Sequence, residues 1–179
     1  AEFSVGDAKG GQPTDMNEQG EVVGTRRKED GTYGSFLWSS ARGIVDLKSF
    51  AGFGGSHATS INSVGEIVGW LTLGSGPFRA WHDPRAFFWT ANQGMSRLTT
   101  PNDGQSSAFS INEVGQIVGS YQTDWSLGDA TAVLKEQKLM DSLFGVWDRS
   151  RITHAALWEK GTFFDLNDLV NGRSALVLQ

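Results

Sequence analysis

Apolar and polar positions alternate over short stretches of this chain, and the alternation recurs at intervals. The clearest repeat is Asn-x-x-Gly, a polar residue, two β-branched residues and a second glycine, at 17–24, 62–69 and 112–119. Each copy predicts a β-hairpin. The Asn side chain bonds its own backbone in a type I turn, and the first glycine adopts the left-handed conformation of a G1 bulge. The β-branched pair then begins the returning strand.

Two further landmarks follow each hairpin. A strand-like run ends in tryptophan at Trp38, Trp89 and Trp158, and a glycine with a short apolar segment ending in leucine comes next. The Asn positions are spaced by 45 and then 50 residues. Each repeat therefore contains about four strands by pattern. In the middle repeat they are expected at 57–62, 66–71, 85–89 and 95–98, with linkers at 49–56 and 99–106.

This regularity predicts an all-β fold of three tandem four-stranded repeats in a single domain spanning 1–179. The repeats lie at about 12–48, 57–98 and 107–166. β-Propeller-like blades are the first interpretation, and a β-trefoil is the alternative. A propeller normally has about four to eight blades, so three fall short of a closed ring. We expect that a second copy or another chain completes it, that the parent array is longer, or that the long insertion of the third repeat acts as a cap.

The third repeat differs from the others by an insertion at about 121–153. Apolar residues recur over 130–144 within it, and Asp129 is a suitable N-cap. This segment predicts a short amphipathic helix.

The composition limits the classes of function. With 39% hydrophobic residues the chain can bury a core, and its 23 glycines indicate many turns. The net charge of −5, with scattered Lys and Arg, argues against a nucleic-acid surface. No apolar run is long enough to span a membrane. The absence of cysteine excludes disulfides, thiolate metal sites and a cysteine nucleophile.

With these landmarks assembled, the sequence resembles the bacterial extracellular repeat called the HAF repeat, named for a His-Ala-Phe run before its tryptophan. The matching runs are 154–156, 85–87 and 34–36, and the Asn-x-x-Gly core matches best over 58–69 and 108–119. The first copy departs at Pro13 and Met16. The resemblance covers most of the chain outside 121–153. It implies an exported or cell-surface bacterial protein of propeller-like blades, and it implies no particular activity.

Tryptophans divide into two groups. Those that recur with the repeat are expected to pack in the core or between repeats. The others lie mainly in the variable segments, where aromatic side chains on a rigid β scaffold commonly stack on sugar rings or anchor a partner. The alternative is that they pack the insertions onto the sheets. With their polar neighbours, the predicted ligand-binding residues are Trp70, Trp81, His82, Asp83, Trp125, Trp147 and Asp148.

Catalytic and metal signals are weak. No Gly-x-Ser-x-Gly elbow accompanies the histidines, and no spacing singles out a pair of carboxylates. His57 and His154 are expected to be structural. We predict no catalytic residue, no metal site and no cofactor.

The sequence thus favours a non-enzymatic, extracytoplasmic β-repeat module that binds a carbohydrate or a protein through aromatic residues of its insertion loops. A fragment of a glycan-cleaving enzyme and a purely architectural segment of a surface assembly are the alternatives.

Overall fold

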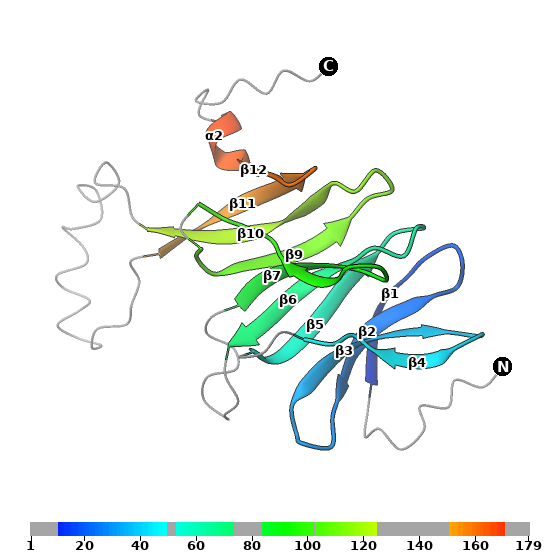
Figure 1. The fold of residues 1–179 in the computed structure, drawn as a ribbon. Helices are drawn as coiled ribbons and strands as arrows, with labels where there is room; N and C mark the ends of the chain where they lie inside the picture. Colours follow the sequence, from blue (N-terminus) through cyan, green and yellow to red (C-terminus); the bar gives the residue numbers. More distant parts are fainter. Residues whose placement is uncertain (1–10, 50–52, 74–83, 102, 125–150, 171–179) are drawn as a thin grey trace.

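The computed structural model describes residues 11–49, 53–73, 84–101, 103–124 and 151–170. They form three four-stranded antiparallel sheets, in each of which the strands follow one another in sequence order (Figure 1). Sheet 1 contains β1 (Gly11–Met16), β2 (Val22–Arg27), β3 (Tyr33–Ser39) and β4 (Gly43–Asp46). Sheet 2 contains β5 (Phe53–Ile61), β6 (Ile67–Leu73), β7 (Pro84–Thr90) and β8 (Gly94–Arg97). Sheet 3 contains β9 (Ser106–Ile111), β10 (Ile117–Asp124), β11 (Arg151–Glu159) and β12 (Thr162–Asp165), and the short helix α2 (Leu166–Val170) follows it.

The prediction of an all-β chain with three four-stranded repeats is confirmed. A β-trefoil would need strands of different repeats to pair in one barrel, and the described strands pair only within their own repeat. The linker predicted at 49–56 is shorter than expected, because β5 already begins at Phe53. The helix predicted over 130–144 lies outside the described residues.

Each hairpin turn has the predicted geometry, which is clearest in the middle repeat. The backbone N–H of Gly65 donates to the carbonyl of Asn62 (3.0 Å), and the N–H of Glu66 donates to Asn62 Oδ1 (2.9 Å). Gly65 has a φ of 80°, in the left-handed region where a side chain would be strained. Asn17 and Asn112 accept the same bonds in their own turns.

The glycine that ends each repeat motif is required for a different reason, which is space. Gly69 lies opposite Ala58 of β5, beside a register shift between Ala58 and Ser60. A Cβ on Gly69 would lie 1.9 Å from the carbonyl oxygen of His57. Gly24 and Gly119 face the same obstruction in their sheets. A side chain at this position would force the first two strands of a repeat apart.

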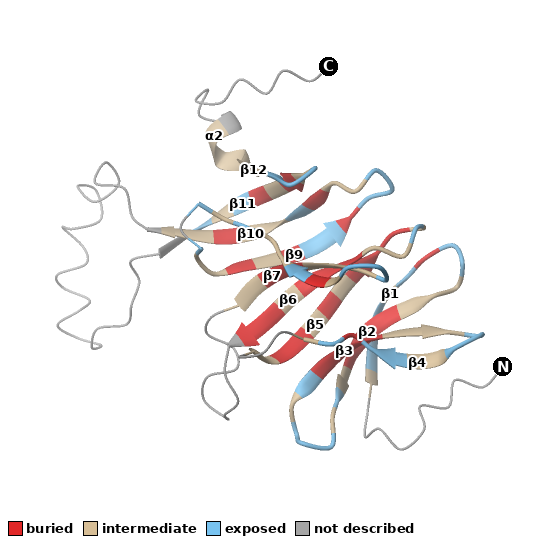
Figure 2. Ribbon diagram, in the orientation of Figure 1, coloured by how far each residue is buried: buried red, intermediate tan, exposed pale blue. Residues whose placement is uncertain are grey.

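Two apolar cores lie between neighbouring sheets rather than within one sheet. β5 packs against β1, β2 and β3, and β9 packs against β5, β6 and β7. Because successive residues of β6 point to opposite faces, Ile67 and Leu71 enter the core shared with sheet 1, and Val68 enters the core shared with sheet 3. Buried segments therefore concentrate in the strands of sheet 2 (Figure 2).

Hydrogen bonds from side chains at recurring repeat positions join neighbouring sheets. Asn17 Nδ2 donates to the carbonyl of Asn62 (3.1 Å), and Asn62 Nδ2 donates to the carbonyl of Asn112 (3.2 Å). We call this series the asparagine ladder. Threonines run beside it, with Thr14 Oγ1 donating to the carbonyl of Ala58 and Thr59 Oγ1 to that of Ala108, both at 2.9 Å. The ladder fixes each repeat at the same height relative to the next.

The start of each following repeat supplies a third tie between repeats. The backbone N–H of Ser35 donates to Ser56 Oγ (2.9 Å), and that of Ala86 donates to Ser106 Oγ (3.1 Å). In sheet 3 the equivalent N–H, of Ala155, donates to Oδ1 of Asn167 in α2 (3.3 Å). Helix α2 thus satisfies a backbone group that the next repeat satisfies in the first two sheets.

The asparagine ladder predicts that the same substitution lowers the free energy of unfolding by different amounts in different repeats. Asn62→Ala removes a side chain that is 1% exposed and deprives both its own turn and the Asn112 carbonyl of a partner. We expect a loss of about 3 kcal/mol of unfolding free energy. Among the described residues, the exposed side chain of Asn112 bonds only within its own turn, so Asn112→Ala should cost about 1 kcal/mol. Urea unfolding of both variants measures the difference, and equal losses would show that the ladder adds no stability.

Candidate functional site

Of the predicted ligand-binding residues, the structure describes Trp70. Trp81, His82 and Asp83 fall in 74–83, and Trp125, Trp147 and Asp148 fall in 125–150, so these six lie outside the described residues. The surroundings of Trp70 are therefore the place where the predicted site can be built from geometry.

Trp70 belongs to a stack of three rings. It lies on β6 directly opposite His57 of β5, and the two rings stack with centroids 3.9 Å apart and planes inclined by 15°. Tyr33, at the start of β3 in sheet 1, continues the stack, with its ring centroid 5.9 Å from that of His57 and an inclination of 27°. We call these three residues the aromatic stack. It bridges two repeats, and its outer member, Tyr33, is 44% exposed.

The sequence identified one of the three members. Trp70 stood out because it belongs to no repeat position, and His57 was expected to be structural. Tyr33 was missed, because it lies in another repeat and only the packing of sheet 1 on sheet 2 brings it to His57.

Burial sets the charge of the central ring. It lowers the pKa of His57 from 6.5 to about 4, because the charged imidazolium would lose hydration between its neighbours. His57 is therefore neutral at pH 7, and the aromatic stack presents an uncharged surface.

The sequence that carries Trp81, His82 and Asp83 follows β6, the strand of Trp70. Trp70 precedes Leu73, the last residue of β6, and residue 74 follows. At about 3.3 Å per residue, the loop that carries Trp81, His82 and Asp83 leaves the strand roughly 13 Å from Trp70.

A second polar cluster lies in sheet 3. His154 Nδ1 lies 2.6 Å from Asp165 Oδ2, and the hydroxyl of Tyr121 donates to the same oxygen (2.7 Å). These bonds hold the pKa of the Asp165 carboxyl below its usual value despite the cost of its partial burial, whereas burial and the adjacent carboxylate raise the pKa of Tyr121. A His oriented by a carboxylate can act as a general base when it also reaches a nucleophile. Among the described residues, however, His154 bonds only to Asp165.

The repeat explains this cluster as a structural tie. Tyr121 and Asp165 occupy the positions that Arg26 and Asp46 hold in sheet 1. There the guanidinium binds the carboxylate through two bonds, Nε to Oδ1 (2.8 Å) and Nη2 to Oδ2 (2.6 Å). In both sheets the pair connects the second strand to the fourth across the third.

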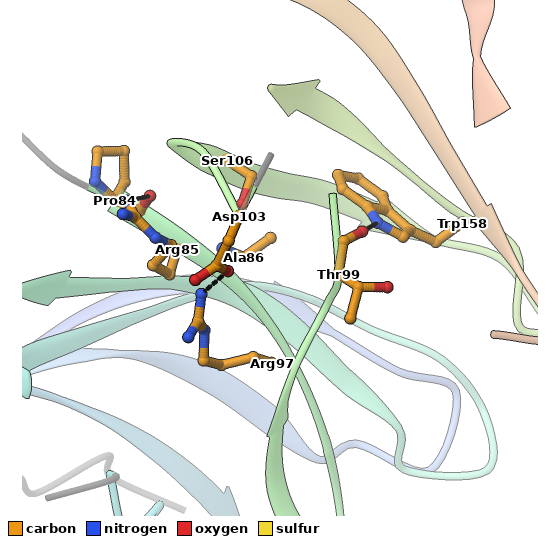
Figure 3. Close-up of polar contacts among 8 residues, drawn as sticks. All are labelled: Pro84, Arg85, Ala86, Arg97, Thr99, Asp103, Ser106 and Trp158. Carbon is orange, nitrogen blue, oxygen red and sulfur yellow. Dashed lines mark hydrogen bonds and ion pairs between the residues drawn. The ribbon is translucent and has the colours of Figure 1, made fainter. Parts of the chain in front are cut away.

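Polar contacts also close the junction between sheets 2 and 3 (Figure 3). Arg97 forms an ion pair with Asp103 in the segment that leads to sheet 3, and the backbone N–H of Ala86 donates to Ser106 Oγ of β9 (3.1 Å). The indole N–H of Trp158 donates to the carbonyl of Thr99 (2.7 Å), and Trp158 is 2% exposed. This repeat-position tryptophan packs between repeats, as the sequence predicts. Trp89 packs only partly against the other core.

The described residues contain no group of three or more His, Asp or Glu side chains placed to hold a metal ion. Within the same part of the chain, no helix has the length and apolar character needed to cross a membrane. No protein-family model matches the sequence, and no curated protein matches it.

The pKa of His57 predicts an acid-sensitive step in stability. The unfolded chain takes up this proton near pH 6.5, whereas the folded chain does so only near pH 4. Unfolding free energy therefore falls as the pH is lowered through this window, by on the order of 2 kcal/mol after allowance for the partial exposure of the ring. We expect His57→Gln to remove this pH dependence in urea unfolding curves taken from pH 7 to pH 4. An unchanged slope in the variant would contradict the burial of a neutral imidazole.

Proposed function

We propose that this chain is a non-enzymatic binding module whose ligand is a carbohydrate or a protein. The observation that carries the proposal is the aromatic stack, which spans two repeats and ends in a partly exposed tyrosine. A neutral, flat aromatic surface offers apolar contact to a sugar ring or to a partner's side chains.

The scaffold supports this role because it holds the stack rigidly. Tyr33 comes from sheet 1, and His57 and Trp70 come from sheet 2, so the stack keeps its shape only while the two sheets stay in register. The asparagine ladder and the shared core maintain that register. A preformed surface loses little conformational entropy on binding, which favours affinity.

The resemblance to the HAF repeat supports the wider setting of the proposal. It favours a location outside the cytoplasm, on an exported or surface protein, with the sheets as propeller-like blades. The ligand would then be an extracellular glycan or a surface protein. A fragment of a glycan-cleaving enzyme is less favoured, because the clearest histidine–carboxylate pair of the described residues occupies a structural repeat position.

A glycan array read alongside light scattering tests the proposal. We expect saturable binding to a sugar class with quenching of tryptophan fluorescence. Tyr33→Ala and Trp81→Ala should weaken that binding at least tenfold while leaving the fold intact. Phe109→Ala is the matched control, because Phe109 is also an exposed aromatic residue (53%) but lies on sheet 3. Binding that none of the loop or stack variants affects would overturn the role of these aromatic residues, and no binding by a well-folded sample would overturn the lectin-like function.

A second candidate, the architectural segment, is favoured by the outer face of sheet 3. Val68 of sheet 2 is 0% exposed because sheet 3 covers it, whereas Val118, its counterpart in sheet 3, is 44% exposed. Among the described residues, the asparagine ladder also ends in sheet 3, at Asn112. In this alternative, sheet 1 of a second copy packs on that face and continues the series of repeats.

Self-association separates the two candidates. The architectural role predicts a mass in light scattering that rises with protein concentration and returns to that of a monomer in Val118→Lys. Val64→Lys is the control, because Val64 is 73% exposed in a hairpin turn and lies away from the sheet face. A monomeric wild-type chain at all concentrations would exclude assembly through this face.

A further inference from the structure

A pocket of about 290 Å³ opens at the rim between sheets 1 and 2. Sheet 1 contributes Asp46, Lys48 and Ser49 from the end of β4 and the segment after it, and sheet 2 contributes Trp89 and Met95 from β7 and β8. Its volume is near the lower end of the range for small-molecule sites, and it suits a ligand the size of one sugar ring.

The repeat shows why this pocket forms between sheets 1 and 2. Trp89 and Trp158 hold the same repeat position, but Trp158 is buried, packs edge-on against Phe163 with ring centroids 5.7 Å apart, and donates to Thr99. In sheet 2, Met95 stands where sheet 3 has Phe163. Trp89 is correspondingly half-buried and lines the pocket. The same residue is thus a packing element at one junction and a pocket wall at the other.

The charged side chains that line the pocket favour an anionic ligand. The Asp46 carboxylate already receives two bonds from Arg26, which hold its pKa below the usual value. Lys48 is exposed and makes no ion pair among the described residues. The pocket therefore combines a carboxylate that is ion-paired with Arg26, an ammonium without an ion-pair partner among the described residues, and an indole.

We propose that this pocket binds an acidic sugar unit, a pyranose that carries a carboxylate. The indole of Trp89 stacks on the apolar face of the ring, and Lys48 pairs with the sugar carboxylate. The Asp46 carboxylate, which keeps further acceptor capacity beyond its two bonds to Arg26, accepts a hydrogen bond from a ring hydroxyl. This site uses no residue of the aromatic stack or of the insertion loops, so it stands apart from the proposed function.

The test is a titration of the chain with methyl β-glucuronide, with methyl β-glucoside as the neutral counterpart, followed by the indole N–H signals in ¹H–¹⁵N NMR spectra. Trp89→Phe identifies the signal of Trp89. We expect this signal to shift saturably with the glucuronide, with a dissociation constant on the order of 1 mM, as is reasonable for one sugar ring. The glucoside should bind at least tenfold more weakly.

Charge variants decide whether the pocket recognises the carboxylate. Lys48→Gln should remove the preference for the glucuronide. Lys160→Gln removes another exposed ammonium, in the turn between β11 and β12, and should leave the preference unchanged. Tyr33→Ala should also leave glucuronide binding unchanged, which separates this pocket from the aromatic stack. No shift at Trp89, or equal affinity in wild type and Lys48→Gln, would overturn the proposal.

Discussion

The structure depends on one repeated side chain, the asparagine that opens each hairpin. The side-chain amide oxygen accepts a backbone N–H and closes the turn. In the first two repeats the amide nitrogen also donates to the following repeat. A carboxylate could close the turn but could not donate to the next carbonyl, and a serine is too short to do both. Local folding and the stacking of repeats are therefore coupled through a single residue.

The stacking that the ladder aligns also supplies the apolar core. A sheet of four short strands is too small to bury much surface alone, so each core is shared between two neighbours. Sheet 2 contributes to both cores and holds most of the fully buried large side chains, among them Phe87, Ile67 and Leu71. We expect the stability of the described part to depend more on the two interfaces than on any single sheet.

Different residues or surroundings at equivalent repeat positions give the three sheets different local contacts. The tie between the second and fourth strands is an Arg–Asp pair in sheet 1 and a Tyr–Asp pair in sheet 3. At the tryptophan position, Trp158 fills the junction between sheets 2 and 3, whereas Trp89 leaves a pocket between sheets 1 and 2. The proposed ligand contacts arise at repeat positions whose surroundings differ between repeats. The asparagines of the ladder cannot be replaced without loss of the register between repeats.

By itself the sequence determined the number of repeats, the hairpins, the left-handed glycines and the tryptophans of the strands, because these follow from local spacing and backbone geometry. It also singled out Trp70, which interrupts the repeat. Only the tertiary structure decided that Tyr33 and His57 join Trp70, and that Lys48 and Trp89 share a pocket. Residues that lie in different repeats meet through packing of whole sheets, and this packing depends on many side chains at once rather than on any local pattern.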